Sequence, residues 1–131
     1  MSLVVDASVL VAATVDSGAE GEWAESLLTE GVLIAPHLMP VEATNVLRRL
    51  EASGKLTRLE AGAAAQDITA LPIELLPFAP FAQRVWALRA NLSSYDAWYV
   101  AIAEHFGIGC ATLDRRLAGA SGPKCEFLLP A

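Results

Sequence analysis

The sequence predicts an α/β fold, in which a short parallel sheet carries helices on both of its faces. Two features of the chain predict it. Short segments alternate with longer helical ones from end to end, and each short segment is mostly apolar, as strands covered on both faces are. With 131 residues and no internal repeat or linker, residues 1–131 are expected to form one domain.

The chain begins with an expected buried strand, Leu3 to Asp6, that ends on a carboxylate. An apolar helix is expected over Ala7–Val15, and an amphipathic helix over Glu20–Glu30. Gly31 ends that helix, and a second strand follows over Val32–Ala35. The later elements are a helix from Pro40 to about Ser53, a helix that the capping-box pair Thr57 and Glu60 opens and that reaches about Ala70, a strand over Ile73–Pro77, a helix over Pro80–Leu92 and a last strand over Glu126–Leu129.

One helix–strand pair organises the rest of the chain. Ser94 suits the N-cap of a helix over Tyr95–Phe106, which is apolar almost all the way round and is therefore expected to be buried. A glycine ends this helix, and the run IGCATL, residues 108–113, predicts a buried strand. Helix and strand have similar lengths, near ~16 Å. A tight connection makes them antiparallel neighbours, which brings Asp96 beside Asp114.

Four acids are expected at the edge where parallel strands end and ligands bind. Asp6 ends the first strand, and Glu42 lies in the first turn of the helix after the second strand. Asp96 and Asp114 reach the same edge through the helix–strand pair. Neighbouring carboxylates repel by about 4 kcal/mol per pair at an effective dielectric constant near 20, so a cation or protons must intervene. Oxygen ligands without His or Cys spacing favour Mg²⁺ or Mn²⁺, which indicates a metal-dependent nuclease or phosphatase.

Each acid also has an ordinary structural interpretation. Asp6 could be a strand-end turn residue, and Asp114 could cap a helix that begins at Arg115. Glu42 and Asp96 could be first-turn acids that favour the positive end of a helix dipole. The convergence of all four positions favours a site.

Polar neighbours could support such a site. Asn45, one turn after the acid of its helix, could steady a ligand or water, or be a plain surface amide. Ser8 and Thr112 could orient metal-bound waters, although a cap and a strand hydroxyl are the better interpretation. His37 and His105 lack ligand spacing and receive no role.

Arginines near the acidic edge are candidates for contacts with a phosphate backbone. Arg115 and Arg116 directly follow Asp114, and Arg84 and Arg89 are further candidates for the same rim. A solvated face explains each of them equally well.

Composition limits the function classes. The net charge of −6 argues against a protein that coats nucleic acid, although acids of a metal site would account for part of it. The apolar fraction of 54% exceeds the roughly 45–50% of average domains, which indicates apolar surface for a partner or second copy. Such surface is expected from Trp23, Leu27, Leu28, Leu47, Leu50, Leu56 and Leu59.

The same composition predicts the compartment. Cys110 and Cys125 have no CxxC spacing and are expected to be buried reduced thiols rather than a disulfide or metal ligands. No membrane span or signal peptide is expected, so a cytoplasmic protein is predicted.

Four motifs, in order, resemble PIN-domain ribonucleases of the VapC toxin type: VVDASVLVA, APHLMPVEATNVLRRL, SSYDAWYVAIAE and CATLDRRL. The resemblance covers nearly the whole chain. It implies a three-layer α/β/α sandwich with a short, mostly parallel central sheet, and a Mg²⁺- or Mn²⁺-dependent endoribonuclease that is the toxin of a type II toxin–antitoxin module. It also implies an RNA substrate, a homodimer and a cognate antitoxin protein. The family's acids fall on Asp6, Glu42, Asp96 and Asp114.

Other acid-bearing folds fit less well. A phosphatase of the haloacid dehalogenase type needs an Asp where this chain has Ser8. A receiver domain needs an acidic pair and a Lys beside it, whereas Lys124 abuts the final strand. A catalytically silent PIN-type binding scaffold stays as the alternative, and metal-dependent cleavage of RNA would distinguish the two.

Overall fold

The computed structural model describes all 131 residues, Met1–Ala131, and confirms the predicted α/β class. Five parallel strands form one sheet in the order β3-β2-β1-β4-β5. The strands are β1 (Ser2–Val5), β2 (Val32–Pro36), β3 (Ile73–Leu76), β4 (Gly109–Ala111) and β5 (Phe127–Leu128). The helices are α1 (Ala7–Val15), α2 (Ala19–Leu28), α3 (Met39–Ala52), α4 (Arg58–Ala70), the 3₁₀ helix η1 (Ala79–Phe81), α5 (Ala82–Ala87), α6 (Ser94–Phe106) and α7 (Arg115–Ala118).

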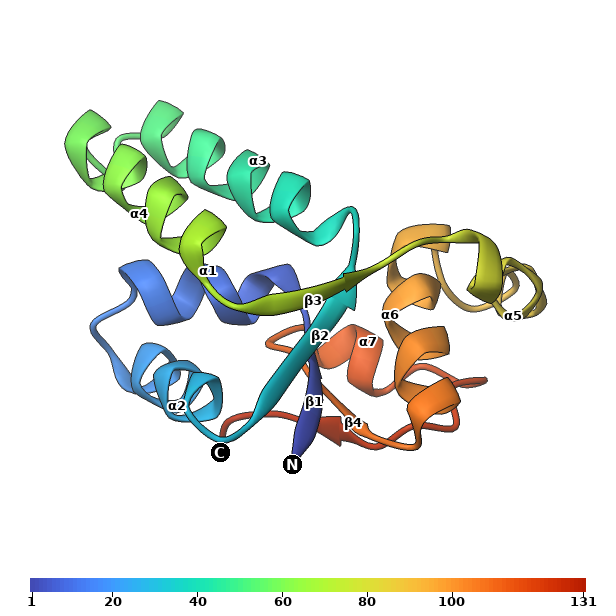
Figure 1. Ribbon diagram of the computed structural model, residues 1–131. Coiled ribbons are helices and arrows are strands. Elements are labelled where there is room, and N and C mark those ends of the chain that lie inside the picture. Colours follow the sequence, from blue (N-terminus) through green and yellow to red (C-terminus); the bar gives the residue numbers. More distant parts are fainter.

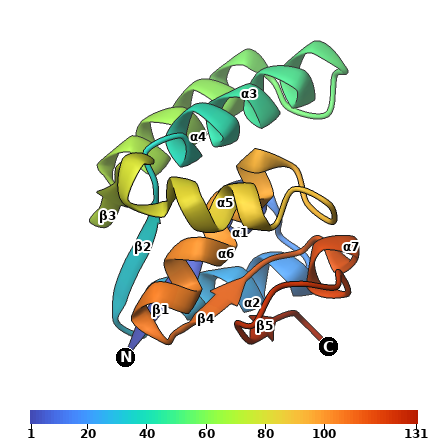
Figure 2. The ribbon, with the colours of Figure 1, turned by 90° about the vertical axis from the view of Figure 1, so that its right-hand side faces the viewer.

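Helices cover both faces of the sheet and give the molecule three layers. Figure 1 shows α1 and α2 on one side of the strands and α5 and α6 on the other. α1 packs against α2, α3 and α4, whereas α6 packs against α5, β1, β2 and β4. α3 and α4 lie side by side and extend beyond the layers (Figure 1 and Figure 2). None of the helices combines the length and the apolar run that crossing a lipid bilayer requires.

One connected core joins the central strands to α6. Val4 in β1 and Val100 and Ile102 in α6 have no exposed surface. This confirms the burial that the apolar pattern of the helix predicts. Its ends reach solvent, where the side chains of Tyr95 and Phe106 are exposed, and Trp98 is partly buried. A helix buried along most of its length fixes the position of its first turn, which belongs to the site described below.

Two boundaries of the helix–strand pair differ from the prediction. Ser93, rather than Ser94, caps α6, and its hydroxyl accepts a hydrogen bond from a backbone N–H of the first turn at 3.1 Å. The strand expected over residues 108–113 is only three residues long. It ends early because the backbone N–H of Leu113 donates to the Ser8 hydroxyl at 3.2 Å instead of to a neighbouring strand.

The helix expected over Pro80–Leu92 is shorter as well. η1 and α5 occupy its first part, and the regular helix ends at Ala87. The next residues wind more tightly, since the backbone N–H of Arg89 donates to the carbonyl of Trp86 three residues earlier. The Arg89 guanidinium donates to the same carbonyl at 2.9 Å and lies over the Trp86 ring, so this arginine stabilises the turn.

The exposed apolar surface differs from the prediction. Of the seven early apolar residues expected to serve assembly, only Leu59 is exposed, with 83% of its surface accessible. Leu27 and Leu47 are buried, and the other four are packed against the core. The other exposed large apolar residues are Met1, Val32, Val41, Leu75, Phe78, Trp86, Tyr95 and Phe106.

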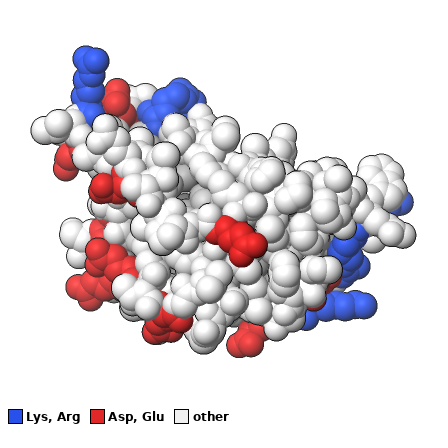
Figure 3. Space-filling view, in the orientation of Figure 1, with Lys and Arg blue, Asp and Glu red and all other residues white.

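Most charged side chains in Figure 3 lie towards the margins of the face, and one acidic patch lies near its centre. Acidic side chains are concentrated over the region of α2, which carries the exposed Glu20, Glu22 and Glu25. Lys and Arg lie at the free end of the α3–α4 pair and on the side of α5 and α6. A share of the net negative charge thus comes from one surface helix.

Cys110 and Cys125 are free thiols, as the sequence predicts. Burial raises the pKa of both thiols, so neither is an activated nucleophile at neutral pH.

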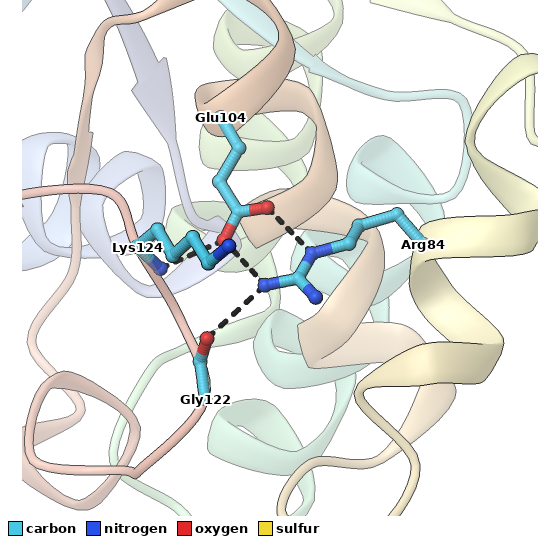
Figure 4. Close-up of polar contacts among 4 residues, drawn as sticks. All are labelled: Arg84, Glu104, Gly122 and Lys124. Carbon is cyan, nitrogen blue, oxygen red and sulfur yellow. Dashed lines mark hydrogen bonds and ion pairs between the residues drawn. The ribbon is translucent and has the colours of Figure 1, made fainter.

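An ion pair fastens the segment before β5 to α5 and α6 (Figure 4). Arg84 donates to the Glu104 carboxylate from Nε at 2.6 Å and from Nη2 at 3.0 Å. Nη2 also donates to the carbonyl of Gly122 at 3.1 Å, and the backbone N–H of Lys124 donates to Glu104 at 2.7 Å. Burial alone would raise the pKa of Glu104, but hydrogen bonds and positive charge from Arg84 and Lys124 lower it below its ordinary value. Arg84 is therefore committed to this pair rather than to a phosphate contact.

The contact between α1 and α2 requires a glycine. Gly21 is buried, and a Cβ there would collide with the carbonyl oxygen of Asp16, the residue that ends α1. Gly62 in α4 is also helical, but a Cβ there would meet nothing within 4 Å. Gly62 can therefore serve as the control for a substitution at Gly21.

Gly21→Ala is expected to lower the free energy of unfolding by about 1–3 kcal/mol, because the added methyl group forces the two helices apart. Gly62→Ala is expected to raise it by about 0.5–1 kcal/mol, because alanine loses less backbone entropy in a helix. Urea unfolding of both variants checks this. Equal stability of the two would contradict the close packing of α1 on α2.

Candidate active site

The four predicted acids line one cleft of about 500 Å³ at the carboxyl ends of the strands. Asp6 directly follows β1, and Glu42 lies in the first turn of α3 after β2. Asp96 lies in the first turn of α6, and Asp114 follows β4 as the N-cap of α7. The structure therefore brings together all four residues that the sequence singles out.

Asp6 is held by contacts with both of its carboxylate oxygens. Oδ1 accepts from the backbone N–H of Ser8 at 2.9 Å, which caps α1. Oδ2 accepts from the Thr112 hydroxyl at 2.6 Å. The backbone N–H of Asp6 donates to the carbonyl of Ala111, so the residue continues the pairing of β1 with β4. The Ser8 backbone N–H and the Thr112 hydroxyl thus fix this carboxylate, whereas the Ser8 hydroxyl accepts from the backbone of Leu113 and caps no helix.

Asp114 is fixed by the same Thr112 hydroxyl, whose oxygen acts here as an acceptor. Its backbone N–H donates to Thr112 Oγ1 at 3.0 Å. Its Oδ1 accepts from the backbone N–H groups of Arg116 and Leu117, at 3.0 and 3.1 Å. The capping role considered for Asp114 is therefore real, and it coexists with a place in the cleft.

Glu42 is oriented by Tyr99, a residue that was not predicted to belong to the site. The Tyr99 hydroxyl donates to Glu42 Oε1 at 2.6 Å. Tyr99 is only 2% exposed, so its hydroxyl is held in one place by the packing of α6. Tyr99 and Asp96 are three residues apart on one helix and share a face. This spacing is a signal from which the residue could have been found.

The cleft concentrates negative charge in a partly buried place. Burial raises the pKa of Glu42, the hydrogen bond from Tyr99 opposes this, and the charges of Asp6 and Asp96 raise it further. Burial also raises the pKa of Asp96, as do the charges of Asp6 and Asp114. Such carboxylates are stabilised by a cation that neutralises them together.

The donors in the cleft fit a hard divalent cation, since they are carboxylate oxygens without nearby thiols or imidazoles. No group of three or more His, Cys, Asp and Glu side chains is arranged tightly enough to hold an ion as it stands. The four acids line one cleft, but their side chains are too far apart to coordinate a single ion together. The chemistry of the donors thus fits a metal, and the side chains would have to close around it.

Other polar and charged residues complete the lining. Asn45 and Arg49 of α3 and Asp16 at the end of α1 face the same cleft. Asn45 and Arg49 follow Glu42 by three and seven residues, so all three lie on one face of α3. Arg49 could therefore have been found from its spacing. Asn45 also accepts from Arg48 Nε at 2.9 Å, so a surface contact accounts for part of its role.

The two consecutive arginines after Asp114 point to different places. Arg116 lines a second cleft, which shares Asp96 and Asp114 with the first. Arg115 donates to the carbonyl of Pro130 at 3.2 Å and lines neither cleft. Of these two arginines, only Arg116 is placed for a contact near the acids.

The chain matches the model of the PIN domain family over residues 3–122. It is 37% identical to Ribonuclease VapC1 of Mycobacterium tuberculosis (strain H37Rv) over 96% of each chain. Ribonuclease VapC9 of the same strain is 36% identical over 95% of each chain. The crystal structure of PAE2754 from Pyrobaculum aerophilum superposes with a TM-score of 0.72 at 26% identity, covering 97% of this chain and 83% of that one.

These matches extend along nearly the full chain and include every element that carries one of the four acids. The fold of the crystal structure agrees with the three layers described above. The chain therefore belongs to the PIN-domain family.

Proposed function

We propose that this protein is a metal-dependent endoribonuclease that hydrolyses RNA phosphodiester bonds and acts as the toxin of a type II toxin–antitoxin module. The observation that carries the proposal is the convergence of Asp6, Glu42, Asp96 and Asp114 on one cleft. The relatives named as ribonucleases, which align over nearly the whole chain, support RNA as the substrate.

The four acids would hold Mg²⁺ or Mn²⁺. When bound, such an ion activates water and stabilises the leaving oxygen of a phosphodiester. The protein's own part is to orient the carboxylates that the ion would neutralise. Thr112 and Ser8 hold Asp6 through hydrogen bonds to its two oxygens, and Tyr99 holds Glu42. Orienting contacts of this kind commonly change metal affinity or activity by about 10–100-fold.

Positive groups beside the cleft would receive the phosphate backbone. Arg116 is placed next to Asp96 and Asp114, and Arg49 lines the wall that α3 forms. Asn45 offers an amide to a ligand or water on that wall. Arg115 is left out of this proposal because it is bound to the C-terminal segment.

Assembly is part of the proposal. Apolar side chains stay exposed on the α3–α4 pair, where Val41 is 62% and Leu59 83% accessible. A partner helix with spaced apolar anchors could bind along α3 and reach the cleft, where a basic residue would meet the acids. We infer an antitoxin of that kind and a homodimer built on other exposed apolar residues.

Asp96→Asn is expected to reduce metal-dependent RNA cleavage below detection while the protein stays folded, because the amide cannot replace an ionised ligand. Asp67→Asn, an exposed acid of α4 outside the cleft, serves as the control and should cleave at the wild-type rate. Cleavage of labelled RNA by the purified proteins is the measurement. A fully active Asp96→Asn would remove this residue from the site, and an inactive wild type would favour the silent scaffold.

Metal binding is expected to stabilise the fold. Mn²⁺ at about 100 times its dissociation constant should add about 2.7 kcal/mol to the free energy of unfolding, if it does not bind the unfolded chain. The double variant Asp6→Asn/Asp96→Asn should lose this gain. Thermal melts across a Mn²⁺ titration measure it, and a flat wild-type titration would count against a metal site.

In a chelator the raised pKa of Asp96 has the opposite consequence. The ionised carboxylate is unfavourable in the folded state, so Asp96→Asn should melt above the wild type at pH 7. As pH falls through the raised pKa, the folded protein takes up its proton before the unfolded chain does, and the deficit of the wild type should shrink. Melts from pH 7 to pH 4 check this direction. A deficit that grows on acidification would contradict it.

The partner is expected to suppress cleavage without dissociating the dimer. Light scattering of the protein, alone and with the product of the adjacent gene, measures both states, and RNA cleavage is followed in parallel. Val41→Glu should weaken this binding but not cleavage, while Ser53→Glu, the same charge change at the far end of α3, should do neither. A monomer that ignores the adjacent gene product and keeps cleaving would overturn the assembly proposal.

A further inference from the structure

A second cleft opens beside the acidic one and shares two of its carboxylates. Asp96 and Asp114 line both, so the two clefts meet at these side chains. The second cleft also measures about 500 Å³, within the range of roughly 300–1,000 Å³ that small ligands occupy. Its polar lining beyond the shared acids is Asn91, Ser93, Arg116 and Ser121.

The two clefts differ in charge. The acidic cleft adds Asp6, Asp16 and Glu42 to the shared acids and has Arg49 as its cation. The second cleft adds no acid, and Arg116 is its one further charged residue. A strand of phosphates is therefore repelled less in the second cleft than in the first. If the reacting phosphate of an anionic polymer lies at the acids, its neighbouring phosphate is placed most favourably in the second cleft.

The lining offers contacts to the other parts of a nucleotide. The Asn91 amide and the Ser121 hydroxyl are exposed donors and acceptors that can pair with a base edge or a ribose 2′-hydroxyl. The half-buried Leu92 gives the cleft an apolar part on which a base can pack. A cleft of this size accepts one unstacked nucleotide rather than a duplex.

The wall of the second cleft is held in place by contacts outside either cleft. Gly122 adjoins Ser121 and has a φ of 108°, a conformation that favours glycine. A Cβ at Gly122 would lie 3.1 Å from Asn91 Nδ2, so the two sides of the wall are in contact. The Gly122 carbonyl accepts from Arg84, which the pair with Glu104 holds in turn (Figure 4). A wall fixed before binding lowers the cost of ordering it around a ligand.

Building on the ribonuclease function proposed above, we propose that the second cleft is a subsite for single-stranded RNA. It holds the nucleotide next to the scissile phosphate. Arg116 contacts the adjoining phosphate, and Asn91 and Ser121 contact the ribose and base. The acidic cleft performs the reaction, and the second cleft determines which nucleotide lies beside the bond that is cut.

Cleavage kinetics test the subsite with matched variants. Ser121→Trp fills the cleft and Arg116→Gln removes its cation, and each should raise KM for an RNA oligonucleotide about tenfold with a smaller change in kcat. Ser26→Trp on the exposed face of α2 and Arg115→Gln are the controls and should keep the wild-type KM. If both cleft variants match their controls, the subsite is overturned.

A second measurement does not depend on turnover. Oligonucleotides with one 4-thiouridine at successive positions are bound to the wild-type protein in a chelator, irradiated, and the crosslinked peptides identified by mass spectrometry. One position should crosslink to residues 91–93 or 116–121. Crosslinks confined to other segments, or none at all, overturn the subsite. Crosslinks at the cleft in a protein that cleaves no RNA would support the subsite and remove the ribonuclease proposal instead.

Discussion

The hydrogen bond from the Thr112 hydroxyl to Asp6 joins the ends of β1 and β4, and the geometry of the cleft depends on it. Thr112 has no exposed surface, so its hydroxyl has to find partners inside the protein. It donates to Asp6 and accepts from the backbone N–H of Asp114. One buried oxygen thereby sets the distance between two acids that are more than one hundred residues apart in sequence. Replacing it with a methyl group would leave Asp6 and the Asp114 N–H without this partner.

Asp6 and Asp114 have the ordinary capping role and also line the cleft. Asp6 and Asp114 cap α1 and α7 with Oδ1, so folding itself orients them. The capping bonds leave Asp114 Oδ2 free for the cleft. The hydrogen bonds that cap α1 and α7 therefore also orient these two carboxylates in the cleft.

The sequence predicted the placement of the acids because that placement depends on backbone topology. Parallel strands end at one edge, and a buried helix joined to the next strand by a tight connection brings Asp96 to that edge. The details that it missed depend on side chains that compete for backbone groups. Ser8 takes the N–H of Leu113 and shortens β4, and Arg89 tightens the turn after α5. Tyr99 was overlooked within an apolar pattern. Its spacing from Asp96 indicates a shared helix face, but periodicity does not reveal where a hydroxyl points.

The outer strand β3 has a consequence for how copies of this protein can associate. It lies at the edge of the sheet, pairs only with β2, and is bounded by Pro72 and Pro77. Prolines lack the N–H that a further strand would need, and the exposed Glu74 places a charge on this short edge. A neighbouring molecule therefore gains few backbone hydrogen bonds by extending the sheet. Copies can still associate through their helices. The sequence of β3, however, disfavours the edge-to-edge pairing of strands that builds fibrous aggregates.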